Sequence, residues 1–187
     1  MGNPTVETGL MTVDQFYAFA DAKPDHEKWE LIGGEPVLNA SPTDFHEKIV
    51  ANVIAALSVR ERELNASWMV LGSVGVRVSD KDRPEPDVSV VSGEPRGTRD
   101  RSDVIVAFEV LSPTTKDQDL NWKRDAYASL ASLTHYVVIA QDAMEVTVFA
   151  REESFKKRSF RCRDDVIDLR SLDVSLPIAD IYWRTGI

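Results

Sequence analysis

Two carboxylates stand in otherwise apolar, strand-like runs of the sequence. Glu109 is the one charged residue in Val104–Leu111, so we expect its side chain in or beside the core. Asp87 opens a second apolar run directly after Pro86, whose ring stiffens the approach to the strand. A buried carboxylate must be paired, protonated or bound to metal. If both acids point the same way from neighbouring strands, a divalent cation with oxygen ligands is the simplest means of holding them together.

Each of these acids also has an ordinary structural interpretation. Glu109 could lie on an edge strand and reach solvent, and Asp87 could cap a turn where a strand begins. The functional interpretation therefore depends on the two carboxylates lying side by side.

A lysine follows the Glu109 run at helical spacing from an aspartate. Asp119 and Lys123 lie four residues apart in a segment whose apolar residues predict a helix over 116–133. Alone, such a pair is a surface ion pair of little energetic consequence. The same stripe continues through Tyr127 into the apolar side of the helix, so Lys123 could swing over the two acids. There it would orient an attacking water or stabilise phosphate charge.

Two further polar residues could reach the same place. Glu30 lies between Trp29 and Leu31 in a predicted strand, and His46 begins a predicted helix in register with its apolar residues. An exposed strand residue and a satisfied core or capping histidine are the structural alternatives.

The composition describes one ordinary globular domain. We expect a single domain over residues 1–187, with 1–11 as a flexible N-terminal segment, because the chain is 43% hydrophobic and 28% charged. Its single cysteine excludes an intramolecular disulfide and suits the cytoplasm. We find no secretion signal and no apolar stretch long enough to span a bilayer, so we expect no membrane partner.

A formal net charge of -9 argues against a protein that coats nucleic acid non-specifically. A nuclease can still carry this charge if clustered acids hold a metal and basic patches persist locally. The segment 155–163 contains five Lys or Arg residues and no acid, and we interpret it first as a solvated strand or turn.

Hydrophobic periodicity predicts a mixed α/β fold. The strand, helix and strand over 104–140 imply a parallel crossover, whereas the early hairpin implies antiparallel pairing. We therefore expect a mixed central sheet flanked by helices. The predicted elements are a helix over 13–20 capped by Thr12, a hairpin of 29–32 with 35–40, a helix over 44–65, strands at 68–78, 87–91 and 104–111, a helix over 116–133, a strand at 135–140, edge strands at 145–150 and within 155–163, and a docked tail at 165–182.

The ordered combination of segments resembles a known family. WELIGGEPV, a helix entered through His46, PEPDVSVV, FEVLSPTTKDQDLNWKRDAYASL and HYVVI together resemble the Uma-type restriction-endonuclease-like proteins. That family is a branch of the PD-(D/E)XK nucleases, and the resemblance extends from about residue 12 to the C-terminus. It implies a restriction-endonuclease-like core with helices flanking a mixed sheet.

The resemblance implies a metal site centred on Asp87 and Glu109. Pro86-Asp87 matches the PD element and Glu109 matches the acid of the (D/E)XK element. The implied ion is Mg²⁺, for which Mn²⁺ can substitute. The further ligands expected are Glu30 and a backbone carbonyl near Val110.

The chain departs from the superfamily pattern at the lysine. Leu111 stands two residues after Glu109, where the pattern places Lys. Some branches move that lysine to the following helix, so Lys123 is the implied replacement and Lys116 a weaker candidate. His46 would assist as a proton carrier.

The function implied is metal-dependent endonuclease activity on phosphodiester bonds of nucleic acid, with DNA the favoured substrate. Cutting a double strand with so small a domain would suggest a homodimer. Two alternatives stay open: a catalytically inactive nuclease-fold protein with a binding or regulatory role, and a hydrolase of another phosphate ester. No glycine-rich phosphate loop or dinucleotide fingerprint supports a nucleotide-dependent enzyme.

Overall fold

A six-stranded mixed sheet forms the centre of the computed structural model, which describes residues 10–111 and 118–187, the side chains of 118–120 excepted. The strand order is β10-β9-β8-β7-β5-β3. The strands are β3 (Trp68–Gly72), β5 (Val88–Ser92), β7 (Val104–Leu111), β8 (His135–Ala140), β9 (Val146–Ala150) and β10 (Lys157–Phe160).

One parallel pair lies in the middle of this sheet. β7 and β8 run parallel, with Val106 opposite His135, whereas every other neighbouring pair of the sheet is antiparallel. The connection between β7 and β8 carries α3 (Arg124–Ala128), as the predicted crossover requires. The predicted mixed α/β sheet is thereby confirmed.

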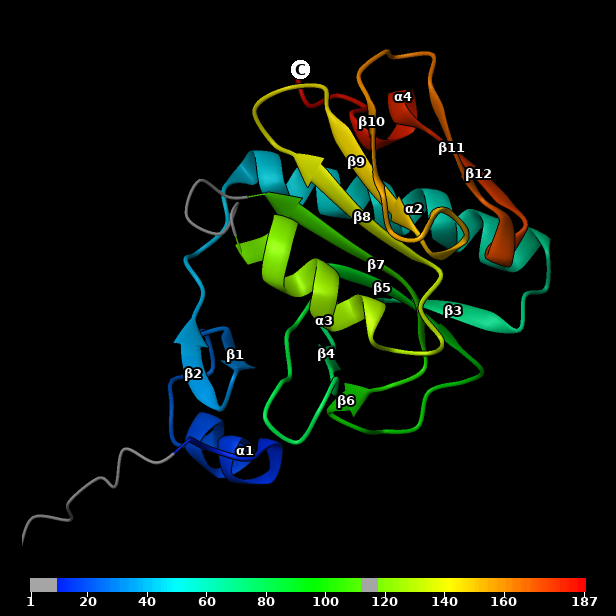
Figure 1. The fold of residues 1–187 in the computed structure, drawn as a ribbon. Coiled ribbons are helices and arrows are strands. Elements are labelled where there is room, and N and C mark those ends of the chain that lie inside the picture. The colour runs from blue at the N-terminus through cyan, green and yellow to red at the C-terminus, as the bar shows by residue number, and fades with distance from the viewer. Residues whose placement is uncertain (1–9, 112–117) are drawn as a thin grey trace, which may run out of the picture.

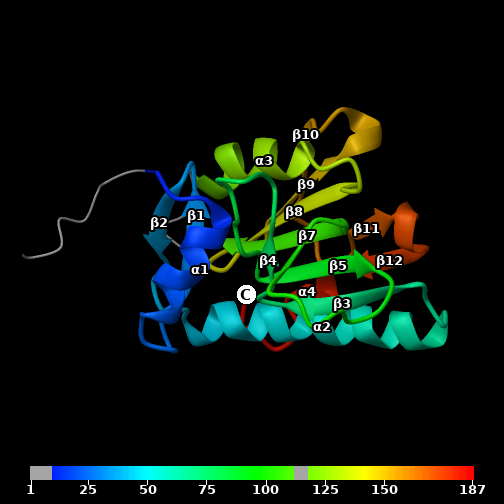
Figure 2. The same cartoon turned by 90° about the horizontal axis from the view of Figure 1, so that it is seen from below.

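Helices cover both faces of the sheet (Figures 1 and 2). The long helix α2 (Asp44–Glu63), the hairpin of β11 (Val166–Leu169) with β12 (Val174–Pro177), and α4 (Ile178–Ile181) pack on one face, while α3 packs on the other. Because side chains alternate along a strand, β7 serves both layers. Val106, Phe108 and Val110 belong to the core on the α2 side, and Ala107 belongs to the core on the α3 side.

Helix α2 follows from its capping and its apolar stripe. Thr43 is the N-cap, and its hydroxyl accepts a hydrogen bond from the His46 N–H at 3.2 Å. Ile49, Val53 and Leu57 are completely buried against the sheet. The predicted helix and the predicted docking of the C-terminal tail are both confirmed.

The N-terminal elements pack beside one end of the sheet. Helix α1 (Val13–Asp21) has the predicted Thr12 cap, in a capping box with Gln15. The predicted hairpin is present as β1 (Trp29–Ile32) and β2 (Glu35–Leu38). Residues 1–9 of the expected flexible segment lie outside the described residues, but the Met11 N–H donates to the Gly34 carbonyl at 2.7 Å, so 10–11 pack against the hairpin.

Two predicted elements differ from the structure. The strand expected over 68–78 ends at Gly72 because Ser73 adopts a left-handed backbone conformation, with φ of 49°. A short strand, β4 (Gly75–Val76), follows and pairs in parallel with β6 (Asp100–Arg101), which we did not predict.

The second difference is the helix expected over 116–133. The described part begins with a π-helical turn, η1 (Gln118–Lys123), and α3 ends at Ala128. The Ser129 hydroxyl donates to the Ala126 carbonyl at 2.6 Å, the kind of local bond by which serine competes with helix continuation. The positions of Lys116 and of the Asp119 side chain lie outside the described part of the chain.

Candidate functional site

The two carboxylates lie side by side at the end of β5 and β7. Val88 of β5 pairs with Phe108 of β7, and Asp87 and Glu109 are the residues that adjoin this pair on the two chain segments, Asp87 directly before β5. Both side chains are nearly buried, at 8% and 4% exposure for the whole residues, and both line a cavity of about 260 Å³.

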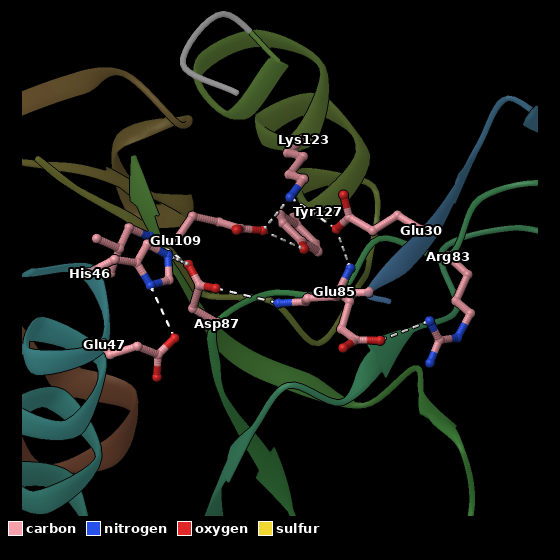
Figure 3. Close-up of polar contacts among 11 residues, drawn as sticks. Glu30, His46, Glu47, Arg83, Glu85, Asp87, Glu109, Lys123 and Tyr127 are labelled. Carbon is pink, nitrogen blue, oxygen red and sulfur yellow. Dashed lines mark hydrogen bonds and ion pairs between the residues drawn. The ribbon is translucent and has the colours of Figure 1, made fainter. Parts of the chain in front are cut away.

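Asp87 is held in place by one backbone group and two cationic side chains. Its Oδ2 accepts a hydrogen bond from the Val110 N–H at 2.8 Å and lies 3.2 Å from His46 Nε2 (Figure 3). Its Oδ1 lies 3.4 Å from Lys28 Nζ. Burial acts to raise the pKa of Asp87, but the hydrogen bond to His46 and the charge of Lys28 lower it overall, so this carboxyl is held ionised.

The pKa values of His46 and Lys28, the two cationic partners of Asp87, are both raised. Burial acts to lower the pKa of His46, yet the hydrogen bond and charge of Asp87 outweigh burial and raise it. Burial likewise acts to lower the pKa of Lys28, and the charge of Asp87, followed by that of Glu85, raises it overall. The site therefore favours a protonated imidazole and a protonated amine next to the aspartate.

Lys123 bridges two buried carboxylates that come from different parts of the chain. Its Nζ lies 2.9 Å from Glu109 Oε1 and 3.0 Å from Glu30 Oε1, and it stands between the two in Figure 3. The Tyr127 hydroxyl donates to the same Glu109 oxygen at 3.0 Å, and the Glu85 N–H donates to Glu30 Oε1 at 2.6 Å. Lys123 ends the π-helical turn η1 and Tyr127 lies four residues later in α3, and both side chains reach the same carboxylate.

The buried side chain of Arg83 holds Glu85 in place. Its carboxylate accepts from the Arg83 guanidinium at 3.0 Å, and Arg83 also donates to the Arg99 carbonyl at 2.9 Å. Arg83 is 7% exposed and lies against Gly75, where a β-carbon would overlap the guanidinium. Gly75 therefore makes room for this buried cation.

The lining of the cavity suits a divalent cation. Four carboxylates, two lysines and His46, which favours its protonated form, face the cavity, so its formal charge is -1. Within 10–111 and 118–187, no group of three or more His, Cys, Asp or Glu side chains is arranged to hold a metal ion. Two carboxylates are nevertheless the usual protein contribution to Mg²⁺, which keeps several water ligands and takes others from substrate phosphates. Asp87 and Glu109 are carboxylate donors of the kind that Mg²⁺ uses.

The predicted residues do not all gather at one point. Asp87, Glu109, His46 and Lys123 line the cavity, whereas Glu30 lies beyond Lys123 and contacts that lysine. Glu30 Oε2 is buried and has no hydrogen-bond partner among the described residues. Val110 contacts Asp87 through its backbone N–H. The metal-binding role expected for the Val110 carbonyl stays a prediction.

Lys28 is the residue that the sequence analysis missed. A signal for it was present, because Lys28 and Glu30 flank Trp29, and alternate residues of an extended segment point the same way. Once Glu30 is a candidate, Lys28 is one as well. Leu111, in the place of the superfamily lysine, contributes its carbonyl as the acceptor of a 2.7 Å hydrogen bond from Gln141.

Comparisons with known proteins agree with this fold. The model of the Uma2 family, described as "Putative restriction endonuclease", matches residues 13–179. A solved structure titled a "putative nuclease belonging to DUF820" from Anabaena variabilis ATCC 29413 superposes with a TM-score of 0.73 at 16% identity, covering 92% of this chain and 97% of the other. That likeness shows a shared fold. No curated protein matches the chain. In the described residues, no helix is both long and apolar enough to cross a membrane.

Proposed function

The chain belongs to the Uma2 family, described as putative restriction endonucleases, and on this premise we propose that it is a divalent-metal-dependent endonuclease. It hydrolyses phosphodiester bonds of nucleic acid, with DNA the favoured substrate. The observation that carries the proposal is that Asp87, directly before β5, and Glu109 of β7 line one cavity, whose other charged groups include two lysines. A two-fold dimer would serve the cutting of a double strand.

Mg²⁺, or Mn²⁺ in its place, would be held by Asp87 and Glu109, with the Val110 carbonyl and Glu30 as further candidate ligands. When bound, such an ion lowers the pKa of a water ligand, polarises the phosphoryl oxygen and balances the charge that develops there. The protein supplies hard oxygen donors that line one cavity. Its lysines neutralise charge around them.

The three cationic side chains would divide the remaining tasks. Lys123 is almost fully buried, and its contacts with Glu30 and Glu109 fix the orientation of the Glu109 carboxylate. His46, favoured in its protonated form by Asp87, can donate a proton to a leaving oxygen and is the candidate proton carrier. Lys28 is partly exposed at the cavity, where an incoming phosphate can meet it.

A non-catalytic binding protein is the second candidate, and one observation favours it. Asp87 contacts His46 and Lys28, and Glu109 contacts Lys123, so each carboxylate already faces a cationic partner. Such a protein would keep the nuclease fold for binding or regulation and would need no metal.

The deciding experiment combines cleavage with metal binding. Supercoiled, linear and single-stranded DNA and RNA are incubated with Mg²⁺, Mn²⁺ or EDTA, using the wild type and the Asp87→Asn, Glu109→Gln and Lys123→Met variants. The exposed Asp142→Asn is the matched control for a lost carboxylate. We expect metal-dependent cleavage that the site variants lose and the control keeps. A folded wild type that cuts nothing and binds neither ion by calorimetry would refute the nuclease and favour the binding protein.

A further inference from the structure

A second cavity adjoins the one that contains Asp87 and Glu109. It has a volume of about 500 Å³ and lies among α1, the loop before β1, and the segments around Arg83 and Arg99. Lys28, Ser73 and Glu85 line both cavities. A ligand that passes Lys28 can therefore occupy both cavities at once.

Aromatic rings and guanidinium groups form the walls of this second cavity. The rings of Tyr17 and Trp29 line it and are half-buried. Arg99 stands 4.5 Å and Arg83 5.7 Å from the Tyr17 ring centroid, and Lys23 stands 5.4 Å from that of Trp29. Flat aromatic and guanidinium surfaces are the groups on which proteins stack unpaired nucleic-acid bases.

The charges of the two cavities differ. Four Lys or Arg and four Asp or Glu residues line the second cavity, so its formal charge is zero. Several of these charges pair with each other, as in the 2.8 Å contact of Arg99 with Asp21 and the 3.0 Å contact of Arg83 with Glu85. The first cavity, at -1 with His46 protonated, attracts a cation. The second, balanced and aromatic, suits a large neutral group with hydrogen-bonding edges.

We propose that the second cavity is a nucleotide subsite, which holds an unpaired base next to the phosphate that Lys28 contacts. The proposal rests on the proposed nuclease function and adds the class of substrate. A base inside a duplex is stacked on both sides and cannot enter such a cavity unless it is extruded. The substrate is therefore single-stranded nucleic acid, or a duplex at a frayed or mismatched position.

Tryptophan fluorescence tests the subsite without cleavage. A ten-residue oligothymidylate, alone or in a duplex with oligoadenylate, is titrated into the wild-type protein in EDTA. We expect the single strand to quench the fluorescence and to bind at least about tenfold more tightly than the duplex, since extrusion of a base costs a few kcal/mol. Trp29→Phe should lose the quenching. The matched variant Trp183→Phe, which removes an exposed indole far along the chain, should keep it.

A second variant measures the stacking itself. Tyr17→Ala should weaken single-strand binding by roughly 5- to 150-fold, the range for loss of one base–aromatic contact. Arg99→Ala removes the nearer of the two cations at the Tyr17 ring and should also weaken binding, whereas Arg184→Ala, which removes one of the cations at the Trp183 ring, should not. The arginine pair remains informative if Tyr17→Ala fails to fold.

The outcomes separate the subsite from the nuclease. The subsite would be overturned if the protein bound single strand and duplex with equal affinity and the quenching survived Trp29→Phe. It would also be overturned if the protein bound neither oligonucleotide. If either result were accompanied by metal-dependent cleavage of duplex DNA, the proposed nuclease function would still be supported. Quenching that requires Trp29, without cleavage in Mg²⁺ or Mn²⁺, would support the subsite and refute the nuclease.

Discussion

Replacement of Lys123 by methionine tests the buried ionic network directly. The Lys123 side chain is 4% exposed, and the carboxylates that it joins, on Glu30 and Glu109, are 1% and 5% exposed. Methionine has a similar length and no charge, so the change removes the ammonium and leaves both carboxylates buried. Of the donors that remain, the Tyr127 hydroxyl serves Glu109 and the Glu85 N–H serves Glu30.

The expected loss of stability is large. Removal of one partner from a buried ion pair costs about 3–5 kcal/mol, because the other charge stays in a poorly solvated place. The total stability of a domain is about 5–15 kcal/mol, so Lys123→Met should lower the melting temperature by roughly 6–20 °C for a chain of this size. The surface variant Lys156→Met should change the free energy of unfolding by less than about 0.5 kcal/mol.

Urea unfolding at neutral pH measures the effect, and a second substitution assigns it. Glu30→Gln on the Lys123→Met background removes one of the stranded charges, so the double variant should recover part of the lost stability. Lys123→Met with wild-type stability, or a double variant less stable than the single one, would refute a network in which Lys123 balances both acids.

Three further predictions concern the scaffold. Gly75→Ala should destabilise the protein by about 1–3 kcal/mol in urea unfolding, because the new β-carbon would displace the buried Arg83; unchanged stability would contradict that packing. The hydrogen bond from Arg101 lowers the pKa of Asp103 to about 2 from 3.8, and a lowered carboxyl pKa contributes stability above pH 4 that is lost as the pH falls toward 2. Asp103→Asn should remove that acid-dependent step, worth about 1 kcal/mol after solvent screening, and an identical acid profile in wild type and variant would count against it. Thr12→Ala should cost about 1 kcal/mol in thermal unfolding through loss of the α1 cap, and no change would mean that the cap contributes nothing.

The apolar runs and their interruptions were enough to predict most of the central fold. The strands that carry Asp87 and Glu109, and the helix entered through His46, follow from hydrophobic periodicity and capping alone. The strand register that brings the two acids close together could not be predicted in this way. Each strand is apolar on both faces, so many different pairings would bury its side chains.

The rest of the site depends on backbone irregularity and on distant pairing. The helix period places Lys123 and Tyr127 on one stripe, but the π-helical turn that precedes α3 is not encoded in that period. Lys28 was missed because a lysine beside a tryptophan is ordinary, and its position becomes meaningful only when the hairpin is packed against Asp87. The roles of the site residues, the metal and the substrate stay predictions that the experiments above test.

The borders of the central sheet constrain how two copies of this chain can meet. At one border lies the edge strand β3, whose Val70 N–H has, among the described residues, no strand beside it to bond. This N–H donates instead to the Glu61 carboxylate of α2, at 3.0 Å. At the other border, β10 exposes the charged side chains of Lys157 and Arg158. Occupied amides and exposed lysines or arginines are means by which proteins prevent strand-to-strand association between molecules. A two-fold assembly of this chain would therefore join through helix or loop surfaces, and extension of the sheet would be disfavoured.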